Sequence, residues 1–165
     1  MAKNSIPAVV PPTGALLLTY LAAAYRVLLA EGLVPLTIGQ PAPTALAQAL
    51  PARDWTLVTA WNPQSVPCDD ATNALADSAM VAELETLAAR RLRASASDAQ
   101  GQWHEDGWLV ADLGADAADD LARRYGQAGI LHWRQDQPVR LRMYRVPADG
   151  DHAQRWVDWV QAPSS

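Results

Sequence analysis

The feature that most constrains the fold is a stretch of alternating side chains from Asp54 to Trp61. In an extended strand these side chains divide into two faces, with Trp55, Leu57, Thr59 and Trp61 on one and Thr56, Val58 and Ala60 on the other. Past Asp54 neither face carries a charge, so we expect a central strand that is covered on both sides. The Asn62-Pro63 pair that follows is expected to end the strand.

The segments after this strand alternate between helical and strand-like patterns. We expect two helices and three further strands, over 70–91, 92–97, 107–113, 115–125 and 130–134. The order strand, helix, strand, strand, helix, strand predicts an α+β fold with a ferredoxin-like split βαβ core, which is an antiparallel sheet with helices on one face. A hairpin arm over 139–146 and a short closing helix over 154–160 are expected to follow.

The segments before the central strand are expected to add an N-terminal helix and strand to this core. Thr13 is a plausible N-cap for a helix that runs to about Ala30, and Pro35 suits a strand over 34–38 at a sheet edge. A short helix over 44–50 comes next. The domain prediction is therefore a flexible N-terminal arm over 1–13, a single α+β domain over 14–161 and a tail over 162–165.

Composition limits the class of protein. The chain has 165 residues, of which 50% are hydrophobic and 19% charged, and this excludes a disordered chain and favours one globular domain. Thirteen Lys and Arg residues against eighteen acidic ones give a net charge of −5, which makes nucleic acid an unlikely main partner. The single cysteine, Cys68, excludes an internal disulfide and a Cys-based zinc site.

The apolar stretch over 14–30 is the only segment that resembles a membrane span. It contains Arg26 and is closed by Glu31-Gly32, so a buried amphipathic helix fits it better than a span does. The N-terminal residues carry no secretory signal. We therefore expect a cytoplasmic protein that makes no membrane contact.

Several chemistries are missing from the sequence. It has no glycine-rich phosphate loop of standard spacing, no Gly-x-Ser-x-Gly elbow and no His-Glu-x-x-His motif. The three histidines lack the spacing of metal ligands. We therefore predict no metal and no cofactor.

Polar residues at the ends of the expected elements are the candidates for a site. Asn62 follows the central strand, where ligands often bind, but it also suits an Asx-type turn before Pro63. Asn73 falls on the inward stripe of the next helix and must find a partner there, because an unpaired buried amide costs about 1–3 kcal/mol. A clamp on the loop and a pocket shared with Ser65 fit Asn73 equally well.

Two further candidates lie later in the chain. His104 and Glu105 precede a strand and carry groups suited to acid–base chemistry, although neighbouring loop residues are mostly solvated. Gln127 stands where a helix turns into a strand, and it suits either a pocket or a cap on the carbonyls at the helix end.

Together these motifs resemble a bacterial family known as domain of unknown function 3293. The resemblance rests on the run Thr59-Ala60-Trp61-Asn62-Pro63 with Ser65, on Asn73 opening a long helix, on Glu105 ahead of a strand and on Tyr125-Gly126-Gln127-Ala128. It covers the chain from about Gly14 to Tyr144. After Glu105 this chain departs from the family pattern of small or hydroxyl residues. The family implies no activity, but it ranks the matched residues as the site to examine.

The sequence leaves three hypotheses for the function. The first is a binding or interaction module for a small molecule or protein, with a polar pocket at the end of the central strand formed by Trp61, Asn62, Ser65, Asn73, Glu105 and Gln127. The second is a hydrolase or transferase for a small substrate, with Glu105 or His104 as acid or base. The third is weak nucleic-acid binding, which requires one shared face for Arg90, Arg91, Arg93, Arg123, Arg124, Arg140, Arg142 and Arg145.

Overall fold

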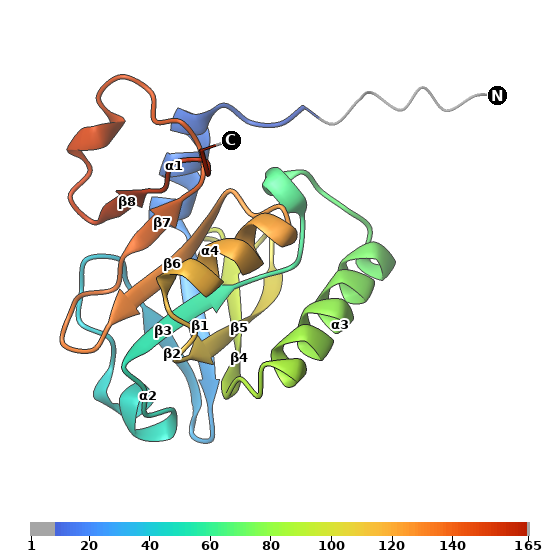
Figure 1. Ribbon diagram of the computed structural model, residues 1–165, viewed down its shortest axis with the longest axis vertical. Helices are drawn as coiled ribbons and strands as arrows, with labels where there is room; N and C mark the ends of the chain where they lie inside the picture. The colour runs from blue at the N-terminus through green and yellow to red at the C-terminus, as the bar shows by residue number, and fades with distance from the viewer. Residues whose placement is uncertain (1–8, 165) are drawn as a thin grey trace.

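The computed structural model describes residues 9–164, so residues 1–8 of the expected arm and Ser165 lie outside the described residues. Within the described range eight strands form one sheet in the order β2-β1-β4-β5-β3-β6-β7-β8. Neighbouring strands are antiparallel except β7 and β8, which are parallel. The sheet curls into a half-barrel (Figure 1). The strands are β1 Ala24–Leu29, β2 Gly32–Leu36, β3 Asp54–Val58, β4 Arg91–Ser97, β5 Glu105–Ala111, β6 Gly129–Arg134, β7 Leu141–Met143 and β8 Val157–Trp159.

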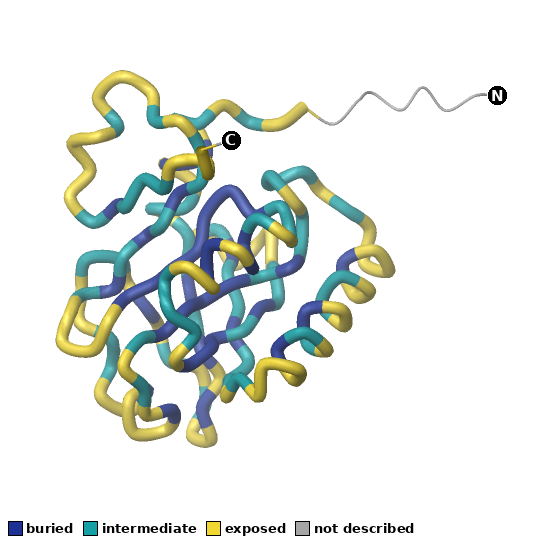
Figure 2. The backbone as a smooth tube through the Cα atoms, viewed as in Figure 1, coloured by how far each residue is buried: buried dark blue, intermediate teal, exposed yellow. Residues whose placement is uncertain are grey.

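Four helices in the described residues complete the α+β architecture: α1 Thr13–Ala22, α2 Thr44–Ala49, α3 Asp70–Thr86 and α4 Ala115–Arg124. Helices α3 and α4 cover the outer face of the central strands. Met80 and Leu84 of α3 and Leu121 of α4 are buried there in one apolar cluster with Val58 of β3 and its neighbours on β5 and β6. Strand β3 is therefore buried on both faces, as its uncharged alternation predicts (Figure 2).

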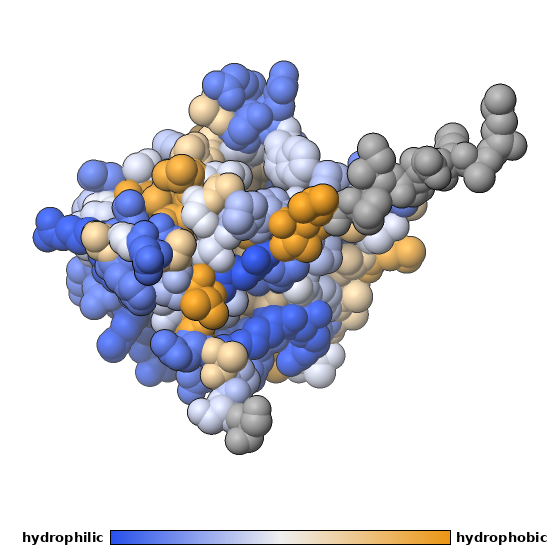
Figure 3. Space-filling model, turned by 90° about the horizontal axis from the view of Figure 1, so that it is seen from above, coloured by the Kyte–Doolittle hydropathy of each residue, from blue (hydrophilic) through white to orange (hydrophobic). Residues whose placement is uncertain are grey.

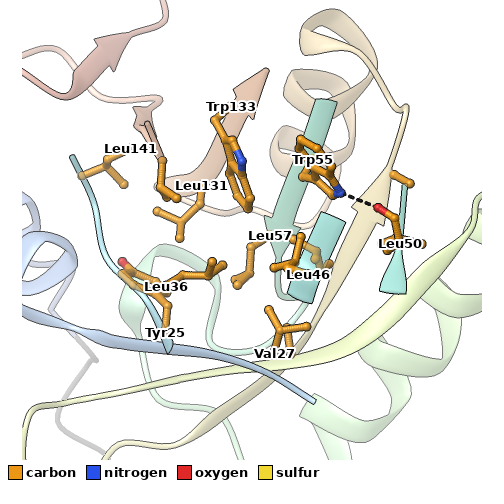
Figure 4. Packing of buried hydrophobic residues seen from close by; sticks show 14 of the residues in the cluster. Tyr25, Val27, Leu36, Leu46, Leu50, Trp55, Leu57, Leu131, Trp133 and Leu141 are labelled. Carbon is orange, nitrogen blue, oxygen red and sulfur yellow. Dashed lines mark hydrogen bonds between the residues drawn. The ribbon is translucent and has the colours of Figure 1, made fainter. Parts of the chain in front are cut away.

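The concave face of the sheet holds the larger apolar cluster, to which β1, β2, β3, β6 and β7 all contribute (Figure 4). Trp55 of β3 stacks on Trp133 of β6 with ring centroids 5.9 Å apart. The indole N–H of Trp55 donates to the Leu50 carbonyl at 2.9 Å, so the tryptophan is buried without an unpaired donor. Leu46 of α2 and Leu16 of α1 belong to the same cluster, and the two helices lie toward opposite ends of the half-barrel (Figure 1).

The expected helix from Thr13 to about Ala30 is wrong beyond Ala22, where α1 ends and the chain turns into β1. Tyr25, Val27 and Leu29 are buried and alternate with more exposed residues, which is the period of a strand. Strand β1 pairs with β2 on one side and β4 on the other, so tertiary pairing overrides the helical pattern. Strand β2, with Pro35, lies at the sheet edge as expected. No helix in residues 9–164 is long and apolar enough to cross a membrane.

Several further expectations are wrong in detail. Thr13 is the first residue of α1 rather than its N-cap, which is Pro12, and the arm expected over 139–146 is a strand only over Leu141–Met143. The helix expected over 70–91 begins as predicted, with the Asp69 carboxylate accepting from the Thr72 N–H at 2.7 Å, but it ends at Thr86. The helix expected over 154–160 is replaced by a 3₁₀ turn over Asp151–Ala153 and then by β8. Without β8, the edge of the sheet at β7 would expose unpaired backbone N–H and C=O groups. Strand β8 pairs with β7 and supplies partners for these groups.

The strand assignment of β1 predicts opposite effects for two adjacent leucines. Leu29 is 6% exposed and packs in the concave cluster, whereas Leu28 is 49% exposed. Leu29→Ala is expected to lower the free energy of unfolding by about 2–5 kcal/mol because it leaves a cavity. Leu28→Ala is expected to change it by about 0.5 kcal/mol or less. Urea unfolding monitored by tryptophan fluorescence measures both, and equal losses would contradict the alternation.

Candidate functional site

One end of the half-barrel gathers the chain segments that carry the candidate residues. The starts of β1, β5 and β6 lie here beside the ends of β4 and β7. The strand register shows this, because Ala24 pairs with Ser97, Ala96 with Glu105 and Gly129 with Met143. The end of β3 lies among them, because β3 pairs with both β5 and β6. Helix α1 leads directly into β1 at this end.

Asn62 occupies the turn after β3 in a left-handed conformation, with φ 45° and ψ 63°. Its side-chain oxygen accepts from the Cys68 N–H at 2.9 Å and from the Asn73 amide at 3.0 Å. Its side-chain amide donates to Glu105 Oε1 at 2.8 Å. Asn73 is 3% exposed and its side-chain oxygen accepts from the Asn62 N–H at 3.0 Å. The two asparagines therefore clamp the loop and at the same time hold the carboxylate of Glu105.

A second set of hydrogen bonds holds the same loop against the turn between α4 and β6. The Gln127 amide donates to the Trp61 carbonyl at 2.9 Å, and it also reaches the Tyr125 carbonyl at the helix end at 3.3 Å. The backbone N–H of Gln64 donates to the Gly126 carbonyl at 2.8 Å. Gln64 and Ser65 share the positive φ of Asn62, at 57° and 58°. Three such residues within four positions indicate a strained loop that its hydrogen bonds hold in place.

Glu105 is half-buried and forms no ion pair with any described residue. Burial raises the pKa of its carboxyl above the usual value, while hydrogen bonds from the Asn62 and Trp103 side chains act in the opposite direction. The carboxylate is thus held by neutral donors; the charge of His104 also acts to lower the pKa, but no described residue forms an ion pair with Glu105.

Tyr20 of α1 also belongs to this site, although the sequence analysis did not select it. Burial, followed by the nearby charge of Glu105, raises the pKa of the Tyr20 phenol to about 12, so the hydroxyl stays protonated at neutral pH. The Ser65 side chain, the Gly129 backbone and Arg145 act in the opposite direction on this pKa, so they lie close to the Tyr20 hydroxyl. No pattern in the sequence indicated Tyr20, because the break between α1 and β1 that turns this end of the helix onto the site was not expected.

A cavity of about 630 Å³ lies between α1 and the loop over 97–103. Its walls are mostly apolar, and they include Leu16, Leu18, Tyr20, Ser65, Trp103 and Glu105. Leu18 and Trp103 are 66% and 50% exposed, so they stand at its outer edge. Apolar patches interrupt the polar surface at this end of the molecule (Figure 3). The cavity volume lies within the range of small-molecule sites, roughly 300–1,000 Å³.

The six residues selected from the sequence take different positions around this cavity. Ser65 and Glu105 line it, whereas Trp61, Asn62, Asn73 and Gln127 do not. His104 does not line it either: its half-exposed ring bonds Asp106 at 2.9 Å and meets the edge of Trp61. Glu105 is therefore the acid–base candidate that has access to the cavity.

The arginine clusters are largely paired with carboxylates. Six of the eight arginines considered for nucleic-acid binding form ion pairs, namely Arg90–Asp112, Arg91–Glu85, Arg93–Asp77, Arg124–Glu83, Arg140–Asp158 and Arg142–Asp119. Residues 9–164 contain no group of three or more His, Cys, Asp or Glu side chains placed to hold a metal ion.

Comparison with known families finds a match for the middle of the chain. The family described as "Protein of unknown function (DUF3293)" matches residues 58–130, from the last residue of β3 to the second residue of β6. This stretch contains all six selected residues, and the resemblance inferred from the sequence is confirmed over it. Neither a curated protein nor a solved structure matches the chain.

The left-handed backbone and the side-chain hydrogen bonds of Asn62 predict that two variants at this position differ in stability. Both Asn62→Ala and Asn62→Gly remove three side-chain hydrogen bonds, each worth about 0.5–1.5 kcal/mol, so both are expected to destabilise by roughly 2 kcal/mol or more. Only alanine is strained at positive φ, so Asn62→Ala is expected to be less stable than Asn62→Gly by about 1 kcal/mol. Urea unfolding of the two variants measures the difference, and an alanine variant as stable as the glycine one contradicts a left-handed turn.

The raised pKa of Glu105 predicts a pH dependence of stability. A carboxyl whose pKa is higher in the folded state than in the unfolded state favours folding when it is protonated. Its contribution to stability is fully present at a pH below the pKa of the unfolded chain, ordinarily 4.5, and is lost as the pH rises through the pKa of the folded protein. The stability of the wild type relative to Glu105→Gln is therefore expected to decrease as the pH rises from below 4.5 toward neutrality. Thermal unfolding across this range measures it, with exposed Glu31→Gln as the control. A constant difference would show that burial does not disfavour the charge.

Proposed function

We propose that this chain, with its DUF3293 segment, is a binding module for a small molecule held in the cavity beside α1. The observation that carries the proposal is the meeting of an apolar cavity of about 630 Å³ with a half-buried carboxylate that has no cationic partner among the described residues. Small-molecule sites combine mostly apolar walls with a few polar groups that orient the ligand.

Under this proposal the selected residues divide into two roles. Ser65 and Glu105 contact the ligand, because their side chains line the cavity. Asn62 and Asn73 position Glu105 through the 2.8 Å and 3.0 Å hydrogen bonds that connect the three side chains. Trp61 and Gln127 support the loop that carries Ser65. In the proposed pocket at the end of the central strand, Ser65 and Glu105 thus contact the ligand, and the other four residues hold them in place.

A second candidate function is catalysis on a small polar substrate, with Glu105 as the general acid or base. The raised pKa of Glu105 favours it, because burial brings a carboxyl nearer to the pH at which it can exchange protons. The hydrogen bond that the Glu105 carboxylate accepts comes from Asn62 and not from a hydroxyl that lines the cavity, which favours the binding module over a nucleophile–base pair. Turnover of a bound compound that Glu105→Gln abolishes while retaining binding would reverse this order.

We also propose that the segment from β3 to β6 is a ferredoxin-like split βαβ core within a domain over 14–161. The antiparallel strand order β4-β5-β3-β6 supports it. So does the single apolar cluster in which α3 and α4 pack against one face of these strands.

Filling the cavity is expected to remove binding. Ala15 of α1 lines the cavity, so Ala15→Trp places a large side chain inside it. A small-molecule library screened by thermal shift is expected to give hits that raise the melting temperature of the wild type and of Ala79→Trp, a matched change on the exposed side of α3, but not of Ala15→Trp. Hits that act equally on all three proteins would place binding elsewhere, and a screen without hits would contradict the proposal.

A further inference from the structure

We infer that the ligand of this cavity is an organic cation, namely a protonated amine on an apolar body, whose ammonium group pairs with the Glu105 carboxylate. The inference rests on the proposed function, since it names the chemical class that the same cavity takes. Three features carry it: the charges around the cavity, the hydrogen-bonding capacity left at Glu105, and the apolar and aromatic walls.

The charges that line the cavity are negative. Glu105 and Asp98 are its ionisable carboxylates, and neither arginine nor lysine lines it. Asp98 Oδ1 accepts from the backbone N–H groups of Gln100 and Gln102 at 3.0 Å and 2.7 Å, which fixes this carboxylate in the turn. Glu105 is the carboxylate that the Asn62–Asn73 hydrogen bonds hold at the cavity.

Two arginines lie close to residues that line the cavity. Arg26 donates to the Ser97 hydroxyl at 3.3 Å, and Arg145 donates through its Nε to the Gln64 side chain at 2.9 Å, while its buried Nη2 has no hydrogen-bond partner among the described residues. Neither forms an ion pair with Glu105. Because two carboxylates and neither arginine nor lysine line the cavity, an anionic ligand would be disfavoured, whereas a cation would offset the cost of burying the Glu105 carboxylate.

Glu105 keeps hydrogen-bonding capacity for an ammonium group. An ionised carboxylate offers about four lone-pair sites, and the Asn62 and Trp103 side chains are the donors that the protein supplies. An ammonium group brings three N–H donors and a charge, and charge-assisted hydrogen bonds are about twice as strong as neutral ones. The Tyr20 hydroxyl, protonated at neutral pH, lines the same cavity and adds a neutral polar group.

The rest of the cavity suits the apolar body of such a ligand. Leu16, Leu18 and the alanines of α1 form one wall, and Tyr20, Tyr25 and Trp103 contribute aromatic rings. Aromatic faces attract ammonium groups and also pack against apolar chains. A carboxylate beside aromatic rings is therefore a combination that selects amines over alcohols and acids of the same shape.

The test compares three probes that share one body: 4-phenylbutylamine, 4-phenylbutan-1-ol and 4-phenylbutyrate. Isothermal titration calorimetry with the full chain is expected to give the amine at least about tenfold tighter binding than the alcohol, with no measurable binding of the acid. Glu105→Gln is expected to reduce the amine to the affinity of the alcohol, and the control Glu31→Gln is expected to leave the preference unchanged. The Gln side chain can still accept from Asn62, so the clamp is kept.

A pH titration of the wild type provides a second readout. Amine affinity is expected to decrease as the pH is lowered and Glu105 takes up a proton, while alcohol affinity stays constant. Equal affinities of amine and alcohol, or a preference that survives in Glu105→Gln, would overturn the cationic class and leave the cavity as a binding site. Binding of the acid alone would also overturn it. Failure of all three probes together with a library screen without hits would overturn the proposed function as well.

Discussion

The side chain of Asn62 is the connection on which the site depends. One amide joins the end of β3 to the N–H of Cys68, to Asn73 in the first turns of α3 and to Glu105 at the start of β5. Asparagine suits this position for two reasons: it tolerates a left-handed backbone better than most residues, and its side chain both donates and accepts. A residue with only one of these properties would either strain the turn or leave a partner unpaired.

Burial on both faces makes this connection rigid. Strand β3 lies between the two apolar clusters, so packing on both faces fixes the position of its end. Close approach of the strands contributes too. A Cβ at Gly107 would lie 2.6 Å from the Val58 carbonyl oxygen, and one at Gly129 would lie 2.7 Å from the Met143 sulfur. Glycine at these two positions lets β5 and β7 approach their neighbours beside the site.

The separation of α1 from β1 creates the cavity. A continuous helix to Ala30 would have removed β1 from the sheet, whereas the break after Ala22 lets β1 complete the half-barrel while α1 lies over its end. Leu16 packs in the concave cluster and Leu18 stays exposed, so α1 is anchored on one side and borders the cavity on the other. The apolar wall and the carboxylate of Glu105 thus come from parts of the chain that are distant in sequence.

Features that depend on local residue patterns could be predicted before the structure was known. The uncharged alternation from Asp54 to Trp61 identified the doubly covered strand, and the inward position of Asn73 showed that this amide needed a partner. Tertiary structure alone decided that β1 is a strand and that β8 pairs with β7, because apolar residues in short segments fit either a helix or a strand until a neighbour supplies backbone partners. It also decided that Tyr20 meets Glu105, since that contact depends on how α1 lies over the sheet and no residue spacing encodes it.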